Sequence, residues 1–143
     1  MPCILLPIDA LRPTIEIGIA FPASLVPAGS ARPAITWIPA IADTGCSHTS
    51  LHGDVCAAAG LNVIGKGITH TANGPVNCNR YLGDMFIKVP FPNGTVFEYP
   101  FRDRMFVQLM QKIPQFDALL GMDIFTMGTL HINGHTKNAT FCW

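Results

Sequence analysis

The chain has 143 residues, the length of one domain with a substantial hydrophobic core. Nine basic and nine acidic residues balance to zero net charge, and only 13% of the residues are charged. No basic surplus indicates a nucleic-acid partner and no stretch is apolar enough to span a membrane, whereas a weakly charged surface favours association with another protein, often a second copy of the chain.

Twelve prolines and thirteen glycines interrupt the sequence every few residues, which predicts short strands joined by turns rather than long helices. Three of the prolines fall in residues 1–13, which we expect to form a loosely held N-terminal arm. The remaining residues, 14–143, are expected to form a single domain.

Two strands open this domain. Apolar side chains lie at every second position from Ile15 to Phe21, and this period of two predicts a half-buried strand over 14–21. After a loop rich in proline, glycine and serine, residues 34–42 are almost entirely apolar and predict a more deeply buried strand. The two strands are expected to pair as a hairpin, and the second one ends at Asp43.

A short helix and a projecting hairpin are predicted next. Ser50 can cap a helix that runs to about Ala59, and Gly60 stands where a helix C-terminus favours a left-handed residue. Residues 68–78 carry an Asn-Gly turn signal at their centre, which predicts a hairpin. Its flanks are too polar to pack in a core, so this hairpin is expected to project as a mobile loop or a lid.

The remaining apolar stretches predict further short strands. Residues 116–125 run from a strand into a short helix. The other strands are expected at 82–89, 96–99 and 104–110, and in a closing hairpin at 130–132 and 139–143. The predicted fold class is therefore mostly β.

The number of cysteines indicates the redox state of the cellular compartment in which the protein is expected. There are five of them, and an odd, sparse set favours free thiols in a reducing compartment over a disulfide framework. No basic region precedes the apolar residues at the N-terminus, which argues against a signal peptide. We therefore expect a cytoplasmic location.

The buried strand that ends at Asp43 is followed at once by Thr44 and Gly45. A carboxylate at the end of such a strand loses hydration free energy unless hydrogen-bond donors receive it. Gly45 allows a tight turn that aims backbone N–H groups at this carboxylate, because glycine has no Cβ. Taken alone, such a triplet is most often a turn at a strand end, so a functional interpretation depends on the rest of the chain.

Three segments, in this order, resemble parts of the retropepsin family of aspartic proteases. Asp43-Thr44-Gly45 matches the catalytic triplet of that family. Thr71-Ala72-Asn73-Gly74 resembles the flap of its bacterial members. The run from Ala118 to Asp123 matches the segment that packs behind the triplet, in which Leu119, Leu120 and Gly121 would support the site.

The resemblance covers about residues 14–132 and implies a single-lobe, closed β-barrel with one or two short helices, assembled as a two-fold homodimer. It also implies an aspartic endopeptidase, in which two carboxylates share one proton and activate a water molecule against a peptide bond. Only Asp43 among the nine acids has the triplet setting, so its partner would be Asp43 of a second chain.

The resemblance also assigns roles to the other matched residues. In the family, Thr44 hydrogen-bonds across the two-fold axis and Gly45 supplies backbone donors to the carboxylates. Ser47 and His48 would border the substrate cleft. The hairpin tip, formed by Thr71, Ala72, Asn73 and Gly74, would fold over a peptide or protein substrate. No cofactor or metal is implied.

Two alternatives stay open at this stage. The first is a catalytically inactive, dimeric peptide- or protein-binding module of the same fold. The second is a zinc site, because Cys46, His48, His52 and Cys56 form a C-x-H-x3-H-x3-C set of side chains that can bind zinc. Cys46 also departs from the family, which usually has Ala or Ser there; it is small enough to fit and adds an oxidisable thiol beside the acid.

Overall fold

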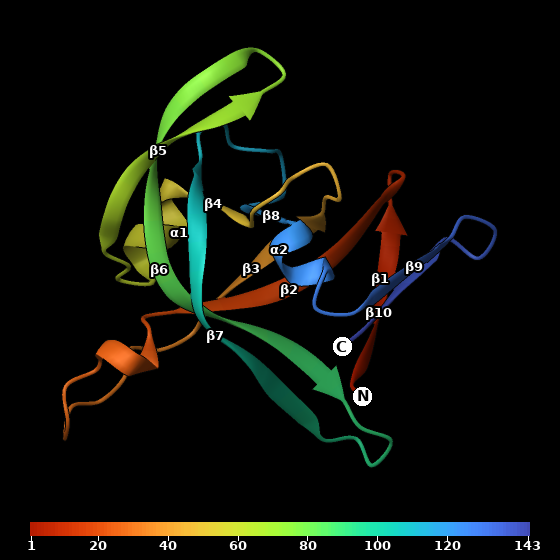
Figure 1. Cartoon of the computed structure of the whole chain (residues 1–143). Coiled ribbons are helices and arrows are strands. Elements are labelled where there is room, and N and C mark those ends of the chain that lie inside the picture. The colour runs from red at the N-terminus through yellow and green to blue at the C-terminus, as the bar shows by residue number, and fades with distance from the viewer.

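The computed structural model describes residues 1–143 as a mostly β fold with two short α-helices (Figure 1). The strands are β1 (Cys3–Asp9), β2 (Arg12–Ala20), β3 (Thr36–Ala42), β4 (Ser50–His52), β5 (Val63–Thr71), β6 (Gly74–Pro90), β7 (Val96–Leu109), β8 (Ala118–Leu120), β9 (Thr129–Asn133) and β10 (Asn138–Cys142). The helices are α1 (Gly53–Ala58), α2 (Met122–Phe125) and a 3-10 turn, η1 (Ala23–Leu25). None of them is long and apolar enough to cross a membrane.

A closed ring of six strands forms the barrel, in the order β2, β3, β8, β4, β7, β6 and back to β2. β2 closes it because it pairs on both sides, with Ile17 opposite Ile38 of β3 and opposite Ile87 of β6. The β3–β8 and β4–β7 pairs are parallel, and the other pairs in the ring are antiparallel. The hairpin expected between residues 14–21 and 34–42 is confirmed.

Apolar side chains from the barrel strands fill its interior. The fully buried ones include Ile17, Ile19, Met85, Ile87 and Phe106. Burial of each side chain contributes about 1.5–3 kcal/mol to the free energy of unfolding, relative to the same side chain in an exposed position. Ile17 and Ile19 of β2, like Met85 and Ile87 of β6, are two residues apart, so each pair lies on one face of its strand.

The N-terminal segment is not a loose arm, so that expectation is wrong. β1 pairs with β10 from Cys3 opposite Cys142 to Pro7 opposite Asn138, and its last residues pair with β2. Ile4 and Leu6 are buried in the core. This alternation of buried and exposed residues is a strand signal that the prolines of the segment obscured.

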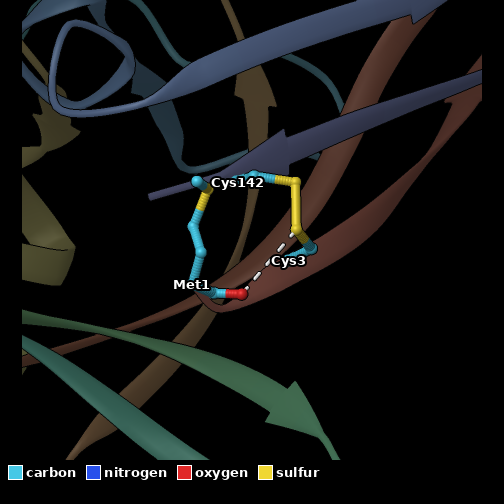
Figure 2. The surroundings of a disulfide bond; sticks show 3 residues. All are labelled: Met1, Cys3 and Cys142. Atoms are coloured by element: carbon cyan, nitrogen blue, oxygen red, sulfur yellow. Dashed lines mark hydrogen bonds between the residues drawn. A yellow bond between two sulfur atoms is a disulfide. The ribbon is translucent and has the colours of Figure 1, made fainter.

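A disulfide joins the two ends of the chain, so Cys3 and Cys142 are not the free thiols expected (Figure 2). Their Cα atoms lie 4.1 Å apart across the β1–β10 pair, although 139 residues separate them in sequence. Cys46, Cys56 and Cys78 are free. The odd cysteine count therefore concealed one bridge, which fastens the terminal strands to each other.

The helix after the triplet begins later than expected. Ser50 does not cap it but lies in β4, where it pairs with Val107 and Leu119. The N-cap of α1 is His52, whose Nδ1 accepts a hydrogen bond from the Asp54 N–H. The end is as expected, because Gly60 has a left-handed φ of 66°.

A buried ionic cluster anchors the long loop between β2 and β3. The Asp84 side chain is fully buried, and its Oδ2 accepts hydrogen bonds from Arg32 and Arg102, each at 2.7 Å. Backbone N–H groups of Asp103 and Ala23 donate to the same carboxylate at 2.8 and 3.1 Å. Burial raises the pKa of Asp84, but the Asp103 N–H, the Arg102 guanidinium, the Ala23 N–H and the Arg32 charge together outweigh it, so the pKa lies below its ordinary value.

The Asp84 cluster predicts how stability depends on pH. A carboxyl group whose pKa is lower in the folded chain stabilises it above the unfolded-state pKa of about 3.9, and this contribution is lost as the pH falls through the folded-state pKa. We expect Asp84→Asn to lower the free energy of unfolding by about 2–3 kcal/mol at pH 7, less than for a fully buried pair because both arginines are partly exposed. The difference from wild type should shrink below about pH 4.

Urea denaturation from pH 3 to pH 7 measures this difference. The matched control is Glu16→Gln, because Glu16 and Lys88 form an exposed ion pair and its loss should change stability by less than about 1 kcal/mol. Equal stabilities of wild type and Asp84→Asn at pH 7 would contradict the role given to the cluster.

Candidate active site

Asp43 follows the last residue of β3, at one end of the barrel. Its N–H donates to the Leu120 carbonyl at 2.9 Å, which ties the start of the turn to β8. The Gly45 N–H donates to Asp43 Oδ1 at 2.9 Å, and the Cys46 N–H donates to the Asp43 carbonyl at 3.1 Å. The turn therefore holds the carboxylate in one position, as the sequence suggested.

Position 45 approaches the Asp43 carboxylate closely. A Cβ at Gly45 would lie 3.1 Å from Asp43 Oδ1. A side chain there would press on the oxygen that the Gly45 N–H holds. Thr44, between the two, is exposed, and its hydroxyl makes no hydrogen bond within the chain.

The loop after the triplet rests on the first turn of α2. The N–H groups of Met122 and Asp123 donate to the carbonyls of Cys46 and Ser47 at 2.8 and 3.1 Å. Unpaired N–H groups at a helix start normally need such acceptors. Gly121 makes the contact close, since a Cβ there would lie 2.6 Å from the carbonyl carbon of His48 and 2.9 Å from the Cys46 carbonyl oxygen.

Thr49 and Asp123, for which the sequence predicts no individual role, complete this contact. The Thr49 N–H and hydroxyl both donate to Asp123 Oδ1, at 2.8 and 2.9 Å. The same hydroxyl accepts a hydrogen bond from the Gly121 N–H at 3.2 Å. Thr49 is fully buried. Both residues lie in segments that the sequence predicts to pack together, and their polar side chains were the only sign of this hydrogen bond.

A cleft of about 480 Å³ lies beside Asp43, between the turn and the hairpin formed by β5 and β6. We call it the Asp43 cleft. Of the residues expected at the site, Asp43, Gly45, Thr71, Ala72, Asn73 and Leu119 line it. Leu120 is buried behind the cleft, with Gly121 directly after it.

The tip of the β5–β6 hairpin, at the top of Figure 1, is built as a tight turn. The Thr71 hydroxyl donates to the Gly74 carbonyl at 2.9 Å and accepts from the Asn73 N–H at 3.2 Å. Gly74 has a φ of 105°, a conformation that side chains disfavour. The hairpin expected at residues 68–78 is present, and its tip is exposed.

Ser47 and His48 lie outside the Asp43 cleft and line a second cavity of about 330 Å³ beside it. We call this cavity the Arg80 pocket, after the arginine of β6 that also lines it. Gly45, Cys46 and His70 line both cavities, so the two form one continuous depression.

The four residues weighed as zinc ligands do not converge on one point. No group of three or more metal-binding side chains comes together anywhere in residues 1–143. His52 caps α1, and burial raises the pKa of Cys56 to about 12, so its thiol stays protonated. The Cys46 thiol donates to the His48 carbonyl at 2.8 Å, within its own loop. The geometry does not support the zinc alternative.

No family model matches this sequence, and no curated protein matches it. Among solved structures, the chain is similar to a retropepsin-like aspartic protease from Rickettsia conorii, with a TM-score of 0.59. The match covers 97% of this chain and 89% of that one, at 15% sequence identity. The chain has the retropepsin-like fold. The fold implied by the sequence resemblance, a closed single-lobe barrel with two short helices, is confirmed.

The close contact at Gly121 predicts the effect of one added methyl group. Gly121→Ala should lower the free energy of unfolding by about 1–3 kcal/mol, because backbone of the Asp43 loop has to move away from the new Cβ. The control is Gly65→Ala, where a Cβ meets no atom within 4 Å, and its effect should stay within about 0.5 kcal/mol. Thermal denaturation measures both. A stability of Gly121→Ala equal to that of Gly65→Ala would show that the contact is loose.

Proposed function

We propose that this protein is an aspartic endopeptidase that hydrolyses peptide bonds at a pair of Asp43 carboxylates, one from each subunit of a homodimer. The observation that carries the proposal is the position of Asp43. A donor from the Gly45 backbone fixes its carboxylate, which lines an open cleft beneath a projecting hairpin in a retropepsin-like fold. An acid in a structural turn has no need of such a cleft.

The acids that line the cleft support the part of the proposal that requires a second chain. Asp43 is the only carboxylate in the lining of the Asp43 cleft, and the Arg80 pocket has none. Hydrolysis by paired carboxylates needs two of them close together. The exposed Thr44 hydroxyl, without a partner in its own chain, supports a symmetric contact of two triplets.

The chemistry follows from two carboxylates that share one proton. The ionised Asp43 takes a proton from a water molecule as this water attacks the carbonyl carbon of the substrate. The protonated Asp43 donates its proton to the carbonyl oxygen, so that a neutral gem-diol forms. Its collapse breaks the C–N bond while the carboxyl group donates a proton to the leaving nitrogen and the other carboxylate takes a proton from one hydroxyl of the gem-diol. No covalent bond to the enzyme forms.

The walls of the Asp43 cleft indicate the substrate class. They include the apolar side chains of Val76, Leu109, Met110, Ile113 and Leu119. An extended peptide with apolar side chains next to the scissile bond would fit such walls. The β5–β6 hairpin would close over this peptide and exclude water, with Thr71, Ala72 and Asn73 nearest to it.

Cleavage of a mixed peptide library tests the proposal at acidic and neutral pH. We expect Asp43→Asn to lower kcat/KM by about 10²–10⁴-fold, because loss of one acid–base group removes this much. The matched control is Asp54→Asn, an exposed acid near the start of α1 that lines neither cavity, and it should cleave like wild type. Cleavage that persists in Asp43→Asn would refute the proposal. Tight peptide binding without cleavage by wild type would instead favour a binding module of the same fold.

A further inference from the structure

The Arg80 pocket differs in charge from the cleft beside it. Three basic side chains, His48, His70 and Arg80, line it, and no carboxylate does. In the lining of the Asp43 cleft, His70 is the only basic side chain, and Val76, Leu109, Met110, Ile113 and Leu119 are apolar. The continuous depression therefore becomes more basic from Asp43 towards Arg80.

Arg80 has no partner within its own chain. Its guanidinium forms no ion pair, and its buried Nε has no hydrogen-bond acceptor. Arg32, Arg102 and Arg104, in contrast, each lie within 3.9 Å of a carboxylate oxygen. A half-buried guanidinium without an acceptor has lost hydration free energy that no other group of the chain restores.

The Arg80 guanidinium lies close to the backbone of Gly67 on β5. A Cβ at Gly67 would lie 2.6 Å from both Nε and Nη2 of Arg80, so the absence of a side chain there leaves the guanidinium its space. The group lines the pocket with no other acceptor to bind. A guanidinium can bind a carboxylate through two parallel hydrogen bonds, which matches its planar fork of donors.

We propose that Arg80 makes the enzyme select peptides that carry an Asp or Glu side chain near the scissile bond, beyond the apolar residue that occupies the Asp43 cleft. This inference rests on the proposed function, and it identifies a specificity-determining residue of the same site. In a two-fold dimer each subunit contributes one Arg80 pocket. The preference for an acidic residue should therefore occur on both sides of the scissile bond.

A peptide series in which one Glu or its neutral isostere Gln is moved through four positions on each side of the bond tests the inference. At pH 6, where Glu is ionised, wild type should cleave the Glu peptide about tenfold faster in kcat/KM at one or more positions on each side. Arg80→Met should bring this ratio to about one. Arg80→Gln, which keeps a polar side chain, provides a second neutral variant.

The matched control is Lys66→Met, which removes a positive charge from an exposed position of the same hairpin outside both cavities. It should keep the tenfold ratio. Equal cleavage of all Glu and Gln pairs by wild type, with activity still dependent on Asp43, would overturn the Arg80 inference and leave the proposed function standing.

A binding measurement tests the Arg80 inference even if the protein does not cleave peptides. Fluorescence anisotropy with Asp43→Asn should show about tenfold tighter binding of the Glu peptide than of the Gln peptide, and Arg80→Met added to this variant should abolish the difference. Such binding in a protein that never cleaves would refute the endopeptidase and retain the acidic-peptide site. Equal binding of both peptides would overturn the Arg80 inference.

Discussion

Backbone hydrogen bonds between two distant segments hold the Asp43 turn in place, and the site depends on them. The Asp43 N–H is bound by the Leu120 carbonyl, and the carbonyls of Cys46 and Ser47 receive the first N–H groups of α2. The segments are more than seventy residues apart in sequence, as the Thr49–Asp123 hydrogen bonds show with a separation of 74. They can approach this closely only because position 121 has no Cβ.

The hydrogen bonds of the Asp43 turn explain how an acidic side chain can be held at the end of the barrel in a chain with few charges. The carboxylate is fixed by the backbone donor of Gly45 rather than by a cation, which would neutralise it. Three of the arginines lie near other carboxylates of the chain. Arg32 and Arg102 neutralise the buried Asp84, Arg104 lies near Asp123, and Arg80 stays available at the basic end of the depression.

Features set by neighbouring residues could be read from the sequence. The alternation of β2, the apolar β3, the Asn-Gly turn of the projecting hairpin and the left-handed Gly60 all depend on local periodicity or backbone freedom. The triplet and the segment behind it could be paired because both resemble a known family. Their geometry agrees with that expectation, although their catalytic roles stay predictions.

Features that depend on residues far apart in sequence could not be read. The Cys3–Cys142 bridge and the β1–β10 pairing join the two ends of the chain, and nothing local marks them. Ser50 is a suitable N-cap residue and so predicts an early start of α1, yet pairing with β7 and β8 holds it in a strand. The Asp84 cluster and the unpaired Arg80 likewise become visible only when the elements are assembled.

The central claim is that each chain supplies half of one active site, and mixing wild type with Asp43→Asn tests it most directly. An equal amount of the variant is added to a fixed amount of wild type, and the subunits are allowed to exchange before peptide cleavage is measured. If both carboxylates are needed, random pairing leaves about half of the original active dimers, so the rate should fall to about half. A rate that does not change, with mixed dimers demonstrated by native mass spectrometry, would contradict a site shared between two chains.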